Sequence, residues 1–298
     1  MQICKNAPLP VHDLDKLYEN TVPFCNKGFS ELREFYGHLD INYIGQYNDQ
    51  AQIDLSKFLV PNKVVDIEGD WGYRNLDEKV LSNCICIMNG VKYNYRNYLN
   101  HIFVRPTFSK NLMKLVKKKA VYIPSHYRKA TFVGFQDPFG IRKRMGELLG
   151  ESSNFDIQYT DRWKGSSNNE SDHAEFERSI LSGSFVLCPR GTGVDSVRFL
   201  ESCAYGRIPI VISDNICFGH DFDLPFYFQF SSMNIDSAIE INKIVSSTPQ
   251  YIIDQYSKNA VEFFNSYVLD YFDNPTKFFL QWYIKNEKYF NSSIRECK

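Results

Sequence analysis

One short stretch of this chain combines arginine, glycine, serine and glutamate in an order that could bind an anion. It reads SGSFVLCPRGTGVDSVRFLESCAYGRIPIVISD and spans residues 182–214. Arg190 can pair with a diphosphate through two parallel hydrogen bonds. Gly191 and Gly193 let the backbone come close to a ligand. Glycine-rich loops are weak signals by themselves, so an ordinary turn beside a structural ion pair stays an alternative.

The elements around this loop predict how the residues are positioned. The apolar run 185–188 is too short for a helix and predicts a buried strand that ends at Pro189. Apolar residues at helical spacing predict a helix over about 196–205, with Gly206 as its left-handed terminator. A second buried strand is expected over 208–212. Such a unit predicts a parallel sheet, in which a ligand lies beyond the carboxyl ends of the strands.

The predicted helix adds further groups to the loop. Ser196 can cap the helix or donate to a phosphate, at a helix end that carries free N–H groups. Glu201 lies five residues on, roughly 7.5 Å along the axis at about 1.5 Å per residue, which suits the ribose of a bound nucleotide. Arg198 could pair with Glu201 and orient it. These residues together predict a nucleoside-diphosphate site.

A second arginine follows another predicted strand. The pattern predicts a strand over 131–135 and a helix over 141–149 that ends at Gly150. Arg142 at the start of this helix is a second candidate ligand for the diphosphate. The alternative is a solvated surface cluster with Lys143.

The loop and helix resemble the donor-binding segment of the exostosin family of glycosyltransferases. The residues that match are Pro189, Arg190, Gly191, Ser196, Arg198, Phe199, Glu201, Gly206, Pro209, Ser213 and Asp214. Further on, the segment 223–226 is similar to the acidic-Leu-Pro-Phe segment of that family. The resemblance also places Gly193 and Asp195 in the donor site and Arg142 after the first strand of the donor domain. The chain is most similar to small virus-encoded exostosin-like transferases, some of which transfer xylose.

The resemblance implies an α/β fold with two Rossmann-like domains facing a cleft (GT-B) and C-terminal helices that cross back to the first domain. It implies an inverting transfer from a UDP-sugar to a glycan or glycoprotein hydroxyl, giving a β-linkage, with xylose as one candidate sugar. We expect an acceptor-side domain over 1–124, a donor domain over 125–255 and C-terminal helices over 256–298.

Strand-length apolar runs in the first domain lie at 41–44, 64–67, 84–88 and 102–104, and a further strand is expected over 120–123. A helix is expected over 111–119. In the second domain, strands are expected over 155–159 and 226–230, a helix over 173–181 and aromatic helices from Pro249 onward.

An inverting transfer needs a base that deprotonates the acceptor hydroxyl. Glu68 and Asp70 follow a predicted strand, and Trp71 and Tyr73 beside them could stack on a sugar ring. We expect the base and the acceptor site here, with a solvated turn as the alternative. His126, near the domain junction, is a more distant candidate base.

Two Asp-x-Asp pairs could hold Mn²⁺ on a diphosphate, at Asp13 and Asp15 and at Asp221 and Asp223. So short a pattern has low specificity. The candidate arginines and the helix N-terminus already supply positive charge for the diphosphate. We therefore expect no essential metal, and no cofactor apart from the sugar nucleotide, which is a co-substrate.

The overall composition limits the classes of protein and partner that fit this chain. Of 298 residues, 43% are hydrophobic and 23% charged, which is typical of a globular chain, and the net charge of −1 offers no general attraction to nucleic acid or membrane. The stretch 105–144 has Asp137 as its only acid, so a basic nucleic-acid-binding module stays a less favoured alternative. The second alternative is a protein that binds a nucleotide sugar or a glycan and has no catalytic activity. No apolar run reaches the roughly 18 residues of a membrane span, no secretory leader is evident, and the eight scattered cysteines favour a reducing compartment, so a cytoplasmic location is expected.

Overall fold

The computed structural model describes residues 42–47, 63–67, 84–88, 91–92, 102–104, 106, 109–136, 140–161, 170–191, 196–213, 216–217 and 223–292. The chain divides into two compact units. Unit 1 comprises Met1–Pro106, Cys217–His220 and Asp270–Lys298, and unit 2 comprises Thr107–Ile216 and Asp221–Leu269. The predicted domain boundaries at 124 and 255 stay predictions.

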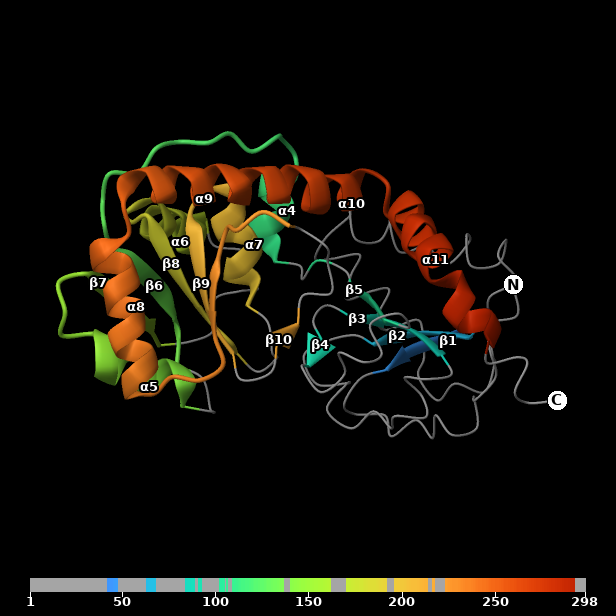
Figure 1. Cartoon of the computed structure of the whole chain (residues 1–298), viewed down its shortest axis with the longest axis horizontal. Helices are drawn as coiled ribbons and strands as arrows, with labels where there is room; N and C mark the ends of the chain where they lie inside the picture. The colour runs from blue at the N-terminus through green and yellow to red at the C-terminus, as the bar shows by residue number, and fades with distance from the viewer. Residues whose placement is uncertain are drawn as a thin grey trace. The chain divides into compact units, whose positions relative to one another are not determined.

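Unit 1 contains a four-stranded parallel sheet with the order β1-β2-β3-β5 (Figure 1). Its described elements are β1 (Asn42–Tyr47), β2 (Lys63–Ile67), β3 (Cys84–Met88), β4 (Val91–Lys92), β5 (Ile102–Val104), α10 (Asp270–Asp273) and α11 (Pro275–Ser292). The four apolar runs that predicted strands in this part of the chain are therefore confirmed. Two-residue strand β10 (Ile216–Cys217) lies where the chain passes between the units.

Unit 2 contains a five-stranded parallel sheet with the order β11-β9-β8-β6-β7. Its strands are β6 (Ala130–Phe135), β7 (Phe155–Thr160), β8 (Phe185–Pro189), β9 (Ile208–Ile212) and β11 (Phe228–Phe230). Its helices are α4 (Lys110–Leu115), α5 (Ile141–Leu149), α6 (Glu170–Leu181), α7 (Val197–Ala204), α8 (Ile235–Ser247), α9 (Gln250–Phe263) and the π-helical turn η4 (Phe264–Leu269). The predicted parallel sheet and α/β class are confirmed.

Both faces of the unit 2 sheet are covered, which explains why β8 and β9 are apolar throughout. Phe185 and Leu187 of β8 point into a core that includes side chains of α5 and α8. Cys188 faces the other way, and its Sγ lies 3.9 Å from Oγ of Ser202 on α7. Every residue of both strands is buried.

The ends of α7 follow the predicted signals. Ser196 is the N-cap residue with an extended backbone, and the helix ends at Ala204. Gly206 then takes a φ of +62°, a left-handed conformation in which glycine carries no steric penalty. The chain turns at once into β9.

The segment 120–123, predicted as a strand, forms no strand, and α4 ends at Leu115 rather than near 119. The backbone of Ala120 pairs with a side chain instead of a neighbouring strand: Asn265 donates to its carbonyl and accepts from its N–H. Helix α8 was not predicted, and β11 begins at Phe228 rather than at 226. Among the helices described, none is long and apolar enough to cross a membrane.

Candidate anion-binding site

The loop after β8 begins at the carboxyl end of the sheet, as the sequence predicts. Pro189 closes the strand opposite Ile212, and the N–H of Arg190 still donates to the Ile212 carbonyl at 2.9 Å. That bond fixes the backbone of Arg190, which is half-buried. Gly191 is the next described residue. Gly193 and Asp195 lie outside the described residues.

Arg142 comes to this loop from the neighbouring strand–helix connection. Gly140, with a φ of +78°, turns the chain into α5 and places Arg142 in the first turn. Its Nη1 donates to the carbonyl of Phe135, the last residue of β6, at 2.7 Å. Its Nη2 lies so close to Gly191 that a Cβ there would stand 2.9 Å from it. The structure thus brings together two predicted ligands that are 49 positions apart in the chain.

Arg198 approaches the same place from α7. Its guanidinium carbon lies 5.2 Å from the ring centre of Phe132 on β6 and 4.5 Å from that of Phe176 on α6. Arg142 lies 5.6 Å from the same Phe132 ring. Two guanidinium groups thus converge on one aromatic ring, where the ring face stabilises positive charge. Only 9% of Arg198 is exposed, and burial lowers its pKa, an effect that the negative charge of Glu201 partly offsets.

The side chain of Ser196, at the N-terminus of α7, makes no capping hydrogen bond. Its hydroxyl is therefore not used to satisfy the helix end. The N-terminus of α7, the helix dipole and the two converging arginines all favour a negative charge at this edge of the sheet. An oxyanion with several oxygens, such as a phosphate, matches this arrangement of donors.

Glu201 is placed differently from the expectation of an open ribose ligand. Only 4% of the residue is exposed, and its Oε1 accepts a hydrogen bond of 2.7 Å from Oγ of Ser109. Burial raises the pKa of Glu201, while Arg198 and the hydrogen bond from Ser109 act in the opposite direction. Glu201 thus connects α7 to α4 inside unit 2. Its role toward a ribose stays a prediction.

Ser109 was missed in the sequence reasoning, although a signal was present. It is the N-cap residue of α4 and accepts a hydrogen bond of 3.0 Å from the N–H of Leu112. A serine directly before an apolar helix is a recognised helix start. What the pattern could not reveal is that the same hydroxyl donates to a carboxylate 92 positions away.

The predicted base and acceptor residues, Glu68, Asp70, Trp71 and Tyr73, lie outside the described residues, as does Asp221. Asp223 is described and exposed. His126 is also exposed and interacts electrostatically with Asp254. Within the described ranges, no group of three or more His, Cys, Asp or Glu side chains is arranged to hold a metal ion.

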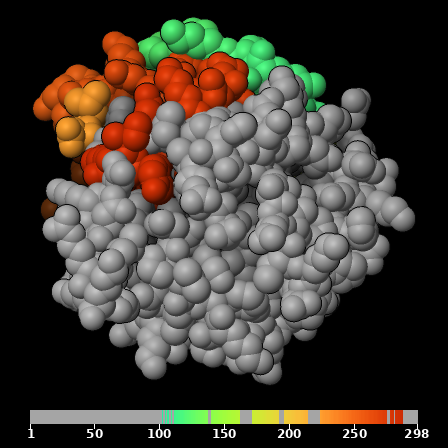
Figure 2. Space-filling model, turned by 90° about the vertical axis from the view of Figure 1, so that its right-hand side faces the viewer, coloured from blue at the N-terminus to red at the C-terminus, as the bar shows by residue number. Residues whose placement is uncertain are grey.

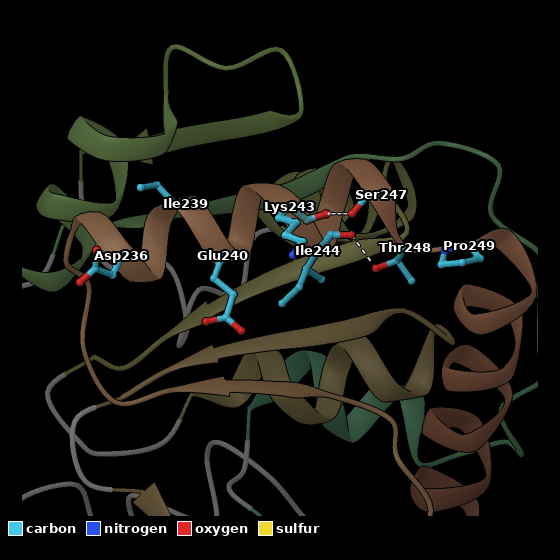
Figure 3. Close-up of a pocket in the computed structure, with 8 residues that line it drawn as sticks. All are labelled: Asp236, Ile239, Glu240, Lys243, Ile244, Ser247, Thr248 and Pro249. Carbon is cyan, nitrogen blue, oxygen red and sulfur yellow. Dashed lines mark hydrogen bonds between the residues drawn. The ribbon is translucent and has the colours of Figure 1, made fainter.

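A surface hollow of about 620 Å³ lies elsewhere in unit 2, along α8 (Figure 3). It is lined by Asp236, Ile239, Glu240, Lys243, Ile244, Ser247, Thr248 and Pro249. The hydroxyls of Ser247 and Thr248 donate to carbonyls of the helix itself, and the charged groups in the lining are two carboxylates and one ammonium group. This lining does not suit an anion, so the loop after β8 remains the candidate site.

The sequence of this chain has limited similarity to known proteins. No protein-family model matches the chain. It is 29% identical over 107 residues to the Exostosin-1 homolog of Caenorhabditis elegans, a match that covers 34% of this chain and 26% of that protein. The match therefore spans about a quarter of the relative's length.

Solved structures with some similarity include TarM and a pneumococcal O-GlcNAc transferase. TarM aligns with a TM-score of 0.40 at 13% identity, over 80% of this chain and 57% of its own. A TarM variant of S. aureus in complex with Fondaparinux, alpha-GlcNAc-glycerol and UDP gives 0.41 at 12%, over 77% and 57%. The pneumococcal O-GlcNAc transferase GtfA in complex with UDP and GlcNAc gives 0.26 at 11%, over 78% and 58%. TM-scores below 0.5 do not establish a common fold, so the α/β class rests on the two parallel sheets themselves.

Proposed function

We propose that the protein is a glycosyltransferase that takes its sugar from a nucleoside diphosphate. The observation that carries the proposal is the convergence of Arg142 and Arg198 on Phe132 of β6, with Arg142 directly against Gly191 in the loop after β8. Two positive charges held this close favour a ligand with more than one negative charge. The partial sequence similarity to an Exostosin-1 homolog and the motif resemblance around Arg190 also support the proposal.

In this proposal the diphosphate lies between Arg142, Arg190 and the N-terminus of α7, with Ser196 as a further donor. These groups stabilise the charge that develops on the diphosphate as it leaves. Arginine and helix-end charge thereby take the place of a metal, so transfer requires none. The donor is a UDP-sugar, with xylose as one candidate sugar.

The reaction is an inverting transfer. The acceptor hydroxyl oxygen attacks the anomeric carbon on the face opposite the diphosphate, and the bond from that carbon to the diphosphate oxygen breaks, with its electron pair leaving on UDP. The hydroxyl proton passes to a carboxylate, for which Glu68 and Asp70 are the candidates. Trp71 and Tyr73 would stack on the acceptor sugar. An α-linked donor then gives a β-linked product. The double-Rossmann (GT-B) architecture is part of the same proposal, and each unit has a parallel sheet of the kind it requires.

A pair of variants on one helix tests the nucleotide site. We expect Arg142→Ala to weaken UDP binding roughly ten- to a hundredfold, as for a lost charged hydrogen bond of about 1.5–3 kcal/mol. Arg144→Ala is the matched control, because Arg144 lies in the same helix but pairs with Glu147 at 3.1 Å. Isothermal titration calorimetry with UDP measures both. Equal affinities for the two variants would refute the proposed site.

Transfer itself is tested by measuring UDP release from a panel of UDP-sugars, with glycan acceptors, in EDTA and in Mn²⁺. We expect UDP release in EDTA. Activity that EDTA abolishes and Mn²⁺ restores would contradict metal independence and turn attention to Asp221 and Asp223. UDP binding without transfer to any acceptor would identify a nucleotide-sugar binding protein instead.

A further inference from the structure

Residues 117–129, here called the basic strap, connect α4 to β6 and run along α9 on the surface of unit 2 (Figure 1). The strap has no regular secondary structure beyond the turn that follows α4. Hydrogen bonds nevertheless hold it in place. Both backbone groups of Ala120 pair with the side-chain amide of Asn265, at 2.9 and 3.0 Å, and the hydroxyl of Tyr122 donates to Asp254 at 2.9 Å.

Further anchors follow along the strap. Nη1 of Arg207 donates to the carbonyl of Ile123 at 2.9 Å, and Nε2 of Gln250 donates to that of Ser125 at 3.1 Å. The N–H of Ser184 donates to the carbonyl of Tyr127 at 2.9 Å. The inner side of the strap is therefore taken up by contacts with its own unit, and its outer side is fixed in orientation.

That outer side presents apolar side chains to solvent. Val121 is 70% exposed, Ile123 57% and Tyr127 67%, whereas Tyr122 between the first two points inward and is half-buried. The alternation is that of an extended chain. Large apolar side chains held outward by a fixed backbone are more informative than a lone exposed residue, because the segment cannot turn them away from water.

Cations surround these apolar side chains. The strap contains five exposed cationic residues and no acidic residue: Lys117, Lys118, Lys119, Arg128 and Lys129. Within the part of the chain that the structure describes, none of the five forms an ion pair with a carboxylate. Figure 2 shows atoms in green, the colour range that includes the strap, at the surface next to atoms in orange.

We propose that the basic strap docks the protein peripherally on an anionic lipid surface. The cations are attracted to acidic headgroups, while Val121 and Ile123 can enter the boundary with the acyl chains and Tyr127 suits the headgroup level. A nucleic acid fits less well, because single strands are bound on aromatic platforms and the outer side offers aliphatic side chains with one tyrosine. The proposal does not depend on the transferase activity.

Cosedimentation of the full-length chain with vesicles tests this inference. Vesicles of phosphatidylcholine alone are compared with vesicles that contain 30% phosphatidylserine, at about 50 and about 300 mM salt. We expect binding to the anionic vesicles, weakened but not abolished by salt, because the apolar contacts are not screened. No binding to anionic vesicles at low salt would overturn the proposal.

Two variants separate the charged from the apolar contribution. The triple change Lys117→Gln, Lys118→Gln and Lys119→Gln should weaken binding roughly a hundredfold, at about fivefold per cation. Its matched control changes three other exposed lysines, Lys143, Lys277 and Lys285, to Gln. The control should bind like the unaltered protein. Equal loss in both triple variants would mean that only net charge matters, and would overturn the role of the strap.

Val121 and Ile123 are replaced by polar residues in one variant and by larger apolar residues in another. Val121→Ser with Ile123→Ser should weaken binding at least tenfold, and Val121→Phe with Ile123→Phe should tighten it. Ile235→Ser with Ile239→Ser is the control, since these two residues are similarly exposed, at 60% and 64%, on α8. The Ser and Phe double variants of Val121 and Ile123 could instead bind like the unaltered protein, with heparin, a soluble polyanion, displacing the protein from vesicles. That result would identify a general polyanion site and refute docking on lipid.

Discussion

Gly191→Ala probes the candidate site more sharply than removal of a charged residue. The φ of Gly191 lies outside the left-handed region, so alanine can adopt its backbone conformation. The new Cβ would stand 2.9 Å from Nη2 of Arg142, whereas ordinary contact begins near 3.4 Å. The guanidinium is the far end of a flexible side chain, so it can withdraw by about 0.5 Å or more without moving the fold.

The expected consequence is a specific loss of nucleotide affinity. A guanidinium displaced by this amount keeps part of a charged hydrogen bond that is worth about 1.5–3 kcal/mol. A loss of about 1–2 kcal/mol corresponds to roughly five- to thirtyfold weaker UDP binding, measured by isothermal titration calorimetry. The melting temperature without ligand should change little.

Gly183→Ala is the contrasting control. A Cβ at Gly183 would stand 2.5 Å from the carbonyl oxygen of Lys129, a backbone atom that cannot withdraw cheaply. This variant should lower the melting temperature while leaving the UDP affinity of the folded fraction unchanged. The two glycines therefore predict opposite patterns from the same chemical change.

A double-mutant cycle decides whether Gly191 acts through Arg142. If the glycine serves to make room for the guanidinium, Gly191→Ala should have no further effect in an Arg142→Ala background. Fully additive losses would mean that the methyl group blocks the ligand itself. Wild-type affinity in both single variants would refute the anion site.

Three further predictions concern the rest of unit 2. Burial raises the pKa of Glu201 in the folded state. The protein should therefore lose stability relative to the Glu201→Gln variant as the pH rises above about 4.5, the pKa of this group in the unfolded chain. Urea denaturation measures this, and a stability difference that is the same at every pH would contradict it. Burial raises the pKa of Cys188 to about 12, so iodoacetamide at pH 8 should alkylate it only after unfolding, as peptide mass spectrometry can determine. Gly206→Ala and Gly140→Ala both place a side chain at positive φ, and each should lower the free energy of unfolding by about 1–2 kcal/mol. The loss should be larger at Gly206, where the added Cβ also meets Val261 at 3.1 Å. Thermal unfolding measures both, and an unaltered melting temperature would contradict the left-handed assignment.

Local patterns were sufficient for the elements that surround the candidate site. Strand β9 matches its predicted bounds and β8 extends one residue further, because a buried parallel strand needs an apolar run of this length between turn residues. Gly206 ends α7 as predicted, because the requirement for a positive φ is local to one residue. The helical spacing of Ala238, Ile241 and Val245 was also present in the sequence of α8, but β-branched and polar residues around it hid the signal.

Residue types and their spacing were enough to identify the candidate anion ligands and the strands and helices that carry them. The three-dimensional fold sets how they meet: Arg142 reaches Gly191, and the guanidinium of Arg198 lies over the rings of Phe132 and Phe176. It also decided that Glu201 is bonded to Ser109, and that the apolar run 120–123 lies at the surface instead of in a sheet. Hydrophobic periodicity reports whether a side chain can be buried, whereas its actual neighbours depend on contacts between residues far apart in the chain, which no local pattern records.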